Sequence, residues 1–532
     1  MYKILLCWRY LLSRYIATAS IISVMLGTAT MIVVNAVMLG FTSEMQVRIH
    51  GILSDVIFQS RDLNKGFPDY PWHRDQILNA AGDLIDELTP LIFVPGMITY
   101  RINGSGEPVS MPVDIFGIDC RTQGKVSDIA KYLQHPENSQ YLSFDLKQDG
   151  YSITGNNTAG SAASNKAAHR FELGYAGWTY RRRYATEQKR LQGLRNANAA
   201  NPPPATAANG DSPSNPFAPS APTETNNPAA QTVFDPAKEQ HTGAIVGIGI
   251  SFYDRLQQID PDTNKKIVID KLALIPGDDV MLTFPTAELP LRFQSGSFTV
   301  TDLYESKMVD YDRKLVFVPI EKLQQLRGMY DEQTGKPTVT QVLIKAKPGT
   351  DINVLRDRLR EKFPVQLFSA RTWRDDQASL LSAVYNELAM LNVLLFLIFA
   401  VAGFGILAIF YMIVVEKQKD IGILKSLGAG SGGIMQIFLY YSLLLGIVGS
   451  GLGLALGLTI VRYIKEIAWG ISQISGSEVF SPEIYSFYEI PTIVDPITVV
   501  CIIVGAVIIA VLSGVLPALR AARLNPVETL RG

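Results

Sequence analysis

Four long runs of uncharged residues dominate the hydrophobic pattern of the chain. No Asp, Glu, Lys, Arg or His occurs in Tyr15–Ser43, Leu388–Val415, Ser426–Val461 or Pro496–Leu519. A bilayer core of about 30 Å requires roughly 20 apolar residues in a helix, and each run is long enough to supply them. No comparable run occurs between Glu44 and Glu387. The pattern therefore predicts four membrane-spanning helices rather than four buried helices of a globular protein.

A basic segment, Met1–Arg14, precedes the first uncharged run. A secretory signal has an apolar core of about 7–15 residues that ends at a cleavage site, and the run here is about twice as long. We therefore expect residues 1–14 to form a basic cytoplasmic amphipathic segment, and the first span to be an uncleaved anchor.

Basic residues near the ends of the spans predict the orientation of the chain. Those assigned to one side are Lys3, Arg9, Arg14, Lys417, Lys419, Lys425, Arg520, Arg523 and Arg531, whereas the loop 465–495 carries only Lys465. Because Lys and Arg near spans favour the cytoplasm, both termini are expected there. The large region 44–387 is then expected in the periplasm, and the protein in the cell inner membrane.

These patterns predict a membrane α-helical fold with four transmembrane helices and an inserted α+β periplasmic domain. The expected order is a first span at 15–43, an extracytoplasmic domain at 44–387, a second span at 388–415, a cytoplasmic helix at 416–432, a third span at 433–464, an extracytoplasmic loop at 465–495, a fourth span at 496–518 and a cytoplasmic tail at 519–532.

Within the outer region, short β-branched segments with alternating polarity predict strands. They are Val56–Gln59, Val113–Ile118, Ile267–Leu274, Ser297–Val300, Leu315–Val318 and Thr340–Lys345. Asp351–Phe363 has the apolar spacing of an amphipathic helix, and Arg181–Arg195 is expected to be a solvated basic helix. Residues 196–240 are rich in Ala, Asn, Pro, Thr and Ser, so we expect them to be disordered. The role of the wider insert, 124–242, does not follow from its composition.

Charge and cysteine content exclude several function classes. Lys and Arg number 48 against 49 Asp and Glu, which gives no indication of a nucleic-acid partner. Cys120 is the only cysteine expected outside the membrane, so no disulfide is expected within the outer domain. The five histidines lack metal-ligand spacing, so no metal is expected. No catalytic residues are predicted, and the chain is interpreted as a non-enzyme.

The polar link between the second and third spans has the pattern of an amphipathic helix. Charged residues occupy one side, and Ile421, Leu424 and Leu427 recur on another. Gly428 is the expected C-terminal stop. An ordinary charged connector remains the alternative, although two to six polar residues would suffice for that purpose.

The third span carries Gly449, Gly453 and Gly457 at four-residue spacing. Such a stripe of small residues lets two helices approach closely. The stripe is interpreted either as packing within one protomer or as the seam of a dimer, and the sequence favours neither. No charged residue lies inside a span, which argues against an ion-driven carrier.

Two long motifs flank the third and fourth spans, EKQKDIGILKSLGA at 416–429 and LPALRAARLNPVETLRG at 516–532. They resemble motifs of the FtsX-like permeases, a family that includes MacB-type exporters and lipoprotein-releasing Lol permeases. Shorter resemblances follow in the family's order, at 27–41, 111–119, 298–326 and 372–373. The resemblance covers most of the chain except about 124–242, and it is closest to the lipoprotein-releasing permeases.

The resemblance implies an ABC transporter permease with a MacB-like periplasmic domain. Its implied ATPase-coupling residues are Glu416, Lys417, Asp420, Ile421, Gly422, Leu424, Lys425, Leu427 and Gly428. Its cytoplasmic tail motif comprises Pro517, Ala521, Arg523 and Pro526. In such systems the apolar residues of the coupling segment fill a cleft of the ATPase, and the charged ones contact the rim.

The sequence contains no G-x-x-x-x-G-K-[ST] motif, so ATP is expected to bind a separate ATPase subunit and this chain to hold no cofactor. The other implied partners are a second permease copy or paralogue, membrane lipids, and lipoproteins with a periplasmic carrier. Lipoprotein release is the favoured function. The alternatives are a MacB-like exporter of small molecules or peptides, and an FtsX-like regulator of a cell-wall hydrolase.

Overall fold

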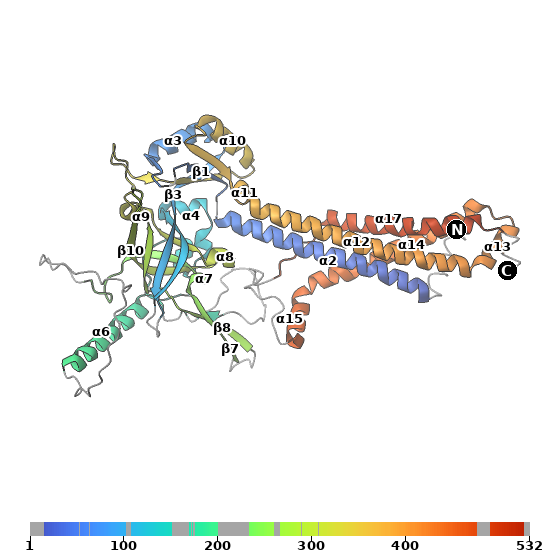
Figure 1. The fold of residues 1–532 in the computed structure, drawn as a ribbon, viewed down its shortest axis with the longest axis horizontal. Helices are drawn as coiled ribbons and strands as arrows, with labels where there is room; N and C mark the ends of the chain where they lie inside the picture. The colour runs from blue at the N-terminus through green and yellow to red at the C-terminus, as the bar shows by residue number, and fades with distance from the viewer. Residues whose placement is uncertain are drawn as a thin grey trace, which may run out of the picture. The chain divides into compact units, whose positions relative to one another are not determined.

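The computed structural model describes residues 15–52, 54–62, 64–102, 108–151, 170–171, 173, 176–200, 234–259, 266–288, 290–306, 308–475 and 490–525. The chain divides into two compact units, Met1–His50 with Arg374–Gly532, and Gly51–Trp373. The first unit is helical and the second carries the sheets (Figure 1). The expected segment 1–14, residues 201–233 of the expected insert and the tail residues 526–532 lie outside the described residues.

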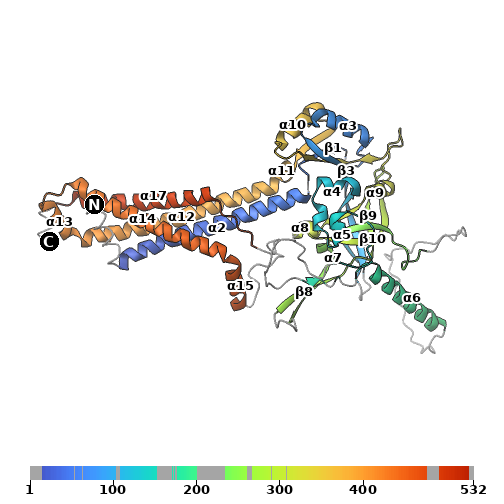
Figure 2. The same ribbon diagram turned by 180° about the vertical axis from the view of Figure 1, so that it is seen from behind.

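The helical unit contains α2 (Tyr15–Ile52), α12 (Ala378–Glu416), α13 (Gln418–Ser426), α14 (Ser431–Arg462), α15 (Ile464–Ser475) and α17 (Pro496–Arg523). Four of them, α2, α12, α14 and α17, are long and apolar enough to cross a membrane, which confirms the predicted number of candidate spans. The same helices run alongside one another in both ribbon views (Figure 2). Both α2 and α12 continue well beyond the uncharged runs.

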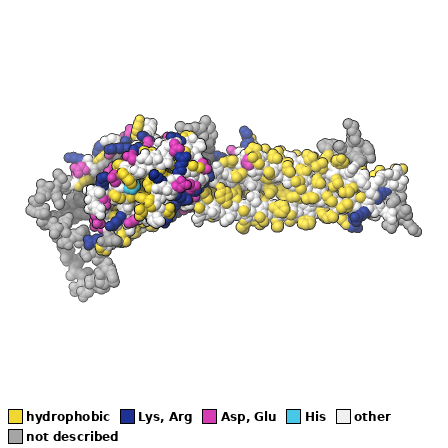
Figure 3. Space-filling model, turned by 90° about the horizontal axis from the view of Figure 1, so that it is seen from above, with side chains coloured by type: hydrophobic (Ala, Val, Ile, Leu, Met, Phe, Trp, Pro, Cys, Tyr) yellow, Lys and Arg dark blue, Asp and Glu magenta, His cyan; other side chains and the backbone are white. Residues whose placement is uncertain are grey.

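The surface of this unit follows the pattern of the sequence. Hydrophobic side chains cover its flank, and Lys and Arg side chains gather near one end (Figure 3). Exposed apolar residues such as Phe396, Phe404 and Leu512 would be costly in water but suit a lipid environment. The inner faces meet in a cluster that includes Phe410, Leu445 and Ala510.

Helix α17 packs against both α12 and α14 and begins at a strong N-terminal cap. The Asp495 carboxylate accepts hydrogen bonds from the backbone N–H groups of Ile497 and Thr498, and Pro496 occupies the first turn. This cap satisfies backbone donors that the helix itself cannot pair. The apolar helix therefore starts at a defined residue.

The second unit is built around a nine-stranded sheet whose strand order is β14-β1-β13-β3-β4-β11-β6-β10-β9. The strands are β1 (Val56–Ser60), β3 (Ile85–Arg101), β4 (Pro108–Ile118), β6 (Thr242–Gly247), β9 (Asp279–Pro285), β10 (Phe293–Tyr304), β11 (Leu315–Pro319), β13 (Gln341–Ala346) and β14 (Phe368–Thr372). The pairings β2 (Phe67–Pro68) with β12 (Thr338–Val339), and β5 (Arg170–Phe171) with β8 (Lys266–Leu272) and β7 (Phe252–Ile259), form smaller sheets.

Helices complete this unit, which confirms the predicted mixture of strands and helices. They are α3 (Tyr70–Ala81), α4 (Cys120–Val126), a 3-10 turn at Ile129–Tyr132, α5 (Pro136–Gln140), α6 (Trp178–Ala200), α7 (Ile248–Ser251), α8 (Val309–Asp312), α9 (Ile320–Arg327), α10 (Ile352–Lys362) and α11 (Trp373–Asp376). The expected solvated helix is α6, yet Arg181 near its start is buried and forms a bidentate ion pair with Asp279.

The long strand β3 joins the two parts of the main sheet. Its first half pairs with β13, where Leu88 lies opposite Ile344, and its second half pairs with β9, where Met97 lies opposite Thr283. The β3–β9 pairing closes β3, β4, β11, β6, β10 and β9 into a ring. Closure leaves these strands without a free edge along that stretch, and their inner side chains form one core.

Both connections to the helices enter this unit through neighbouring strands. Strand β1 follows α2 in the chain and pairs antiparallel with β14, which precedes α11 and α12. The Trp373 N–H donates a 3.2 Å hydrogen bond to the Asp55 carbonyl at the start of this pair. The buried Leu355 and Leu359 of α10 join the core beneath β1.

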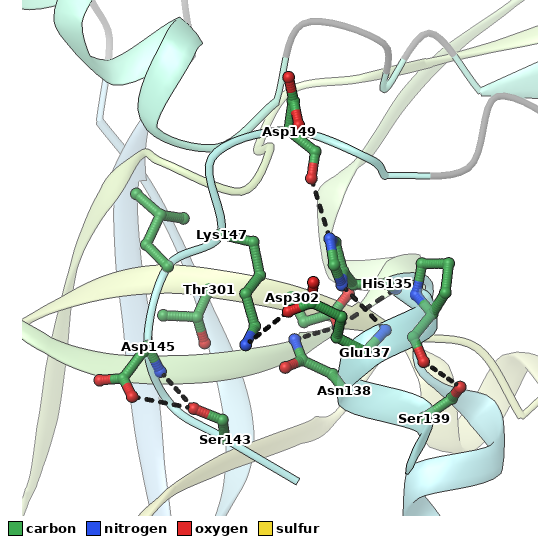
Figure 4. Close-up of polar contacts among 12 residues, drawn as sticks. His135, Glu137, Asn138, Ser139, Ser143, Asp145, Lys147, Asp149, Thr301 and Asp302 are labelled. Atoms are coloured by element: carbon green, nitrogen blue, oxygen red, sulfur yellow. Dashed lines mark hydrogen bonds and ion pairs between the residues drawn. The ribbon is translucent and has the colours of Figure 1, made fainter. Parts of the chain in front are cut away.

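A buried polar cluster lies at β10, which the sequence did not reveal. The Asp302 carboxylate is fully buried and accepts hydrogen bonds from Asn138 Nδ2 at 2.8 Å, the His135 N–H and the Leu303 N–H (Figure 4). His135 Nδ1 accepts a hydrogen bond from the Glu137 N–H, so its Nε2 carries the proton donated to the Asp149 carbonyl. Burial raises the pKa of Asp302 to about 6 despite these donors.

The raised pKa of Asp302 predicts a pH dependence of stability. The folded protein holds this proton more tightly than the unfolded chain, whose Asp pKa is about 3.9. Stability should therefore fall as pH rises from about 4 to about 6, by about 3 kcal/mol for this group. Thermal unfolding of the detergent-solubilised protein across this range should show the loss in wild type and not in Asp302→Asn. The exposed Asp310→Asn is the matched control, and equal pH slopes for wild type and Asp302→Asn would contradict the assignment.

Candidate functional site

The polar link between α12 and α14 folds as the short helix α13, Gln418–Ser426. It ends where Gly428 adopts a left-handed conformation with φ of 96°. The Gly428 N–H donates to the Lys425 carbonyl and the Ala429 N–H to the Leu424 carbonyl, each at 3.0 Å. This pair of bonds is a Schellman motif, which glycine accommodates best. Gly428 is therefore the helix stop that the sequence predicts.

One side of α13 packs against the neighbouring helices of the helical unit. Ile421 is buried and belongs to the same apolar cluster as Ile434 and Ala521, and Gly422 is buried beside it. The sequence placed Ile421 on a docking face together with Leu424 and Leu427. In the structure Ile421 does not lie on that face, because its side chain is buried and anchors α13 to α14 and α17.

Lys425 also points inward. Its ammonium donates hydrogen bonds of 2.7 Å to the carbonyls of Ala522 and Leu524 at the C-terminal end of α17. The last carbonyls of a helix have no partner within it and carry partial negative charge, so a lysine there is stabilising. The expected contact of Lys425 with the rim of a partner is thus replaced by an intramolecular cap.

The opposite side of α13 is exposed and apolar. Ile423, Leu424 and Leu427 are 48%, 41% and 80% exposed. The sequence had named Leu424 and Leu427 but not Ile423, whose position lies off the three-residue repeat. An exposed apolar face on a helix whose other side is packed against its neighbours is typical of a docking surface.

The charged residues of α13 lie around this face. Lys417 and Asp420 form an ion pair of 2.7 Å on the first turn, and Glu416 is exposed at the end of α12. The pair is one helical turn apart, so it orders the start of α13 but contributes little to stability. Both groups remain near the surface, as the sequence predicts.

The tail motif lies at the end of α17, next to α13. Pro517 and Ala521 are buried, whereas Arg523 is exposed, and Pro526 lies outside the described residues. The Arg520 guanidinium, which the sequence named only for the orientation of the chain, stacks over the Tyr411 ring of α12 at 4.6 Å and hydrogen-bonds its hydroxyl. The tail motif and α13 therefore belong to one polar end of the helical unit.

The glycine stripe of α14 packs against α2 of the same chain. A Cβ on Gly449 would lie 2.8 Å from Val24 Cβ, one on Gly453 2.7 Å from the Met25 carbonyl, and one on Gly457 3.2 Å from Ile32 Cβ. These distances allow no side chain without a shift. The stripe is therefore a contact within one protomer, which favours the first of its two interpretations.

The helical unit thus combines four helices that could span a membrane with a short, anchored helix whose apolar face is exposed. Comparison with known proteins identifies this part of the chain. Residues 392–526, which cover α13, α14, α17 and most of α12, match the model of the FtsX-like permease C-terminal domain. The chain thus carries an FtsX-like permease domain, as the motifs at 416–429 and 516–532 predict.

Relatives extend the similarity. The chain is 29% identical to the lipoprotein-releasing system transmembrane protein LolC of Xylella fastidiosa, over 48% of this chain and 60% of that protein. It is 28% identical to LolE of Haemophilus influenzae over 28% of this chain and 36% of that protein. It is 27% identical to the macrolide export ATP-binding/permease protein MacB of Bdellovibrio bacteriovorus over 37% and 29%, respectively. The chain therefore spans less than two thirds of each of these relatives.

The tight packing of α14 on α2 generates a test within one helix. Gly453→Ala places a methyl group 2.7 Å from the Met25 carbonyl, whereas a Cβ at Gly451 meets nothing within 4 Å. Gly453→Ala should destabilise the detergent-solubilised protein by about 1–3 kcal/mol because its backbone contacts must shift. Gly451→Ala should have no such cost, since alanine favours helix by up to about 1 kcal/mol. Equal melting temperatures of the two variants would argue against the α2–α14 contact.

Proposed function

We propose that this chain is the permease subunit of an ABC transporter, and that α13 docks on a separate ATPase subunit. One observation carries the proposal: α13 is anchored by Ile421 and Lys425 while Leu424 and Leu427 remain exposed. A helix fixed by these contacts can transmit a force from its partner to the neighbouring helices without unfolding. The similarity to permeases of the LolC, LolE and MacB types supports the same conclusion.

The chemistry of α13 matches the expected contact. Ile423, Leu424 and Leu427 would enter an apolar cleft of the ATPase, and the charged Glu416, Lys417 and Asp420 would meet its polar rim. Interfaces of this kind rely on a few desolvated apolar residues surrounded by polar contacts. ATP would bind only the partner, so this chain would serve as a non-catalytic subunit without a cofactor of its own.

The distribution of charge supports one orientation in the inner membrane. The end of the helical unit that carries α13 also carries Lys419, Arg520 and Arg523, and basic residues near spans favour the cytoplasm. Both termini would then be cytoplasmic. The unit Gly51–Trp373 would be a periplasmic domain of the MacB-like type.

Lipoprotein release is the function we favour within this class. Two of the relatives are named for a lipoprotein-releasing system. In addition, a groove of about 720 Å³ lies among α2, α12 and α17, lined mainly by apolar residues such as Leu39, Phe396 and Ile509 with Asn35 and Asn392. A largely apolar groove with a few amides fits membrane lipids and the acyl chains of a lipid-modified substrate. A second permease copy or paralogue and a periplasmic carrier would complete the system.

Substitution of the exposed apolar face tests the ATPase contact. The double variant Leu424→Asp/Leu427→Asp should abolish co-purification of the ATPase subunit, because each desolvated apolar anchor contributes about 2 kcal/mol or more. Leu367→Asp places the same charge at an exposed leucine of the other unit and should leave the complex intact. A double variant that still retains its ATPase would exclude α13 as the docking site.

Depletion of the protein in its host tests the substrate. If the permease releases lipoproteins, outer-membrane lipoproteins should accumulate in the inner membrane, as fractionation and immunoblotting would show. Correct sorting after depletion would exclude this function. Accumulation of a small-molecule or peptide toxin would instead indicate MacB-like export, and a defect in cell-wall cleavage would indicate an FtsX-like regulator.

A further inference from the structure

We propose that α17 transmits the movement of α13 to α2, through one joint at each of its ends. The inference rests on the proposed function, since it assigns the path by which an ATPase-driven movement would reach the second unit. It concerns Lys425 at one end, and Gly40 with Ile493 at the other. These are positioning residues, because they act through the helices that they join.

The first joint fixes α13 to the C-terminal end of α17. The two hydrogen bonds from Lys425 to Ala522 and Leu524, together with the burial of Ile421 beside Ala518 and Ala521, leave α13 no freedom to slide past α17. A displacement of α13 along the membrane normal must therefore displace the end of α17 as well.

Helix α17 runs from Pro496 to Arg523, and Pro517 inside it removes one backbone hydrogen bond. The helix is packed on both sides of this proline, by Gly514 before it and by the buried Ala518 and Ala521 after it. Gly514 of α17 lies so close to the Ser442 hydroxyl that a Cβ would overlap it, and a Cβ on Gly446 of α14 would lie 3.0 Å from Ala510 Cβ. Close-packed helices shift as rigid bodies rather than deform.

The second joint lies where the segment before α17 crosses α2. The Ile493 N–H donates a 2.9 Å hydrogen bond to the Ala36 carbonyl of α2. One turn further along α2, Gly40 faces the Pro491 carbonyl so closely that any side chain would overlap it. Only glycine permits this approach of two backbones, and it puts the segment 490–495 in register with α2.

The Asp495 cap makes this segment part of α17. The Asp495 carboxylate binds the first N–H groups of α17 and also the Thr498 hydroxyl at 2.6 Å. The backbone from Ile493 to Thr498 is thus tied at both ends, once to α2 and once to α17. A displacement of α17 consequently pulls on α2 at Ala36–Gly40.

From there the chain leads directly to the second unit. Helix α2 continues to Ile52 and β1 begins at Val56. The competing route is α12, which leads into α13 at Glu416 and reaches β14 through α11. An experiment can distinguish the two routes, because Gly40 and Ile493 lie outside α12 and their substitution leaves that helix unchanged.

Two variants break the second joint and leave α13 untouched. Gly40→Leu forces the Pro491 carbonyl away from α2, and Ile493→Pro removes the N–H that binds Ala36. Each has a matched control. A Cβ at Gly27, on the same helix, meets Phe399 at 3.4 Å, an ordinary contact, so Gly27→Ala should be neutral. Val494→Pro changes a neighbouring residue whose N–H donates no hydrogen bond among those of the described residues.

The measurement is made on the full permease–ATPase complex in nanodiscs. Amide hydrogen exchange of Val56–Ser60 is compared without nucleotide and with ATP plus vanadate. Gly40→Leu and Ile493→Pro should retain the ATPase and its hydrolysis, but the nucleotide-dependent change in exchange should fall by about twofold or more. The two controls should respond as the wild type does.

The outcomes distinguish the inference from the proposed function. A full wild-type response in Gly40→Leu and Ile493→Pro would overturn the α17 route and leave the ATPase contact standing. If Gly40→Leu does not assemble, Ile493→Pro decides, since the Ile493 side chain is exposed and the residue lies outside any helix or strand. A wild-type chain that retains no ATPase would overturn the proposed function and the route together. A wild-type complex that hydrolyses ATP with no change in exchange at Val56–Ser60 would overturn the route alone.

Discussion

The contact between the Lys425 ammonium and the last carbonyls of α17 is the interaction on which the helical unit depends. Without it, a nine-residue helix such as α13 would be marginal, since isolated helices shorter than about 12 residues are unstable in water. The cap satisfies carbonyls that α17 leaves unpaired, while Leu424 and Leu427 remain exposed on another side of α13. An otherwise ordinary link thereby becomes a rigid part of the helical unit.

Close backbone approach has a comparable importance within the spans. Lipid chains are as apolar as leucine, so hydrophobic burial alone does not hold membrane helices together. Glycine and alanine occupy the contacts of α14 with α2 and α17, at Gly453, Gly446 and Ala510. In the other unit, stability comes from a closed ring of strands and the apolar clusters packed on it. The buried Asp302 is an exception there, because its cost in free energy depends on pH.

Much of the site could be predicted from the sequence, and the errors have a physical cause. The motif at 416–429 located α13, and Gly428 located its end, because helix stops are determined by local backbone geometry. The periodicity of Ile421, Leu424 and Leu427 suggested one apolar face. Each three-residue step turns the side-chain direction around the helix by about 60°, which is about 120° from Ile421 to Leu427, so the first is buried while the last is exposed. Which of them the neighbouring helices cover depends on α14 and α17, which no local pattern describes.

The sequence by itself determined the four candidate spans, six of the strands of the outer region and the position of the polar link, because hydrophobic length, alternation and helix stops are properties of neighbouring residues. Only the tertiary structure decided that Lys425 caps α17, that the glycine stripe of α14 faces α2, and that β3 closes a ring with β9. Each of these is a contact between residues far apart in the chain. Such contacts follow from the packing of whole helices and strands, which a local sequence pattern does not describe.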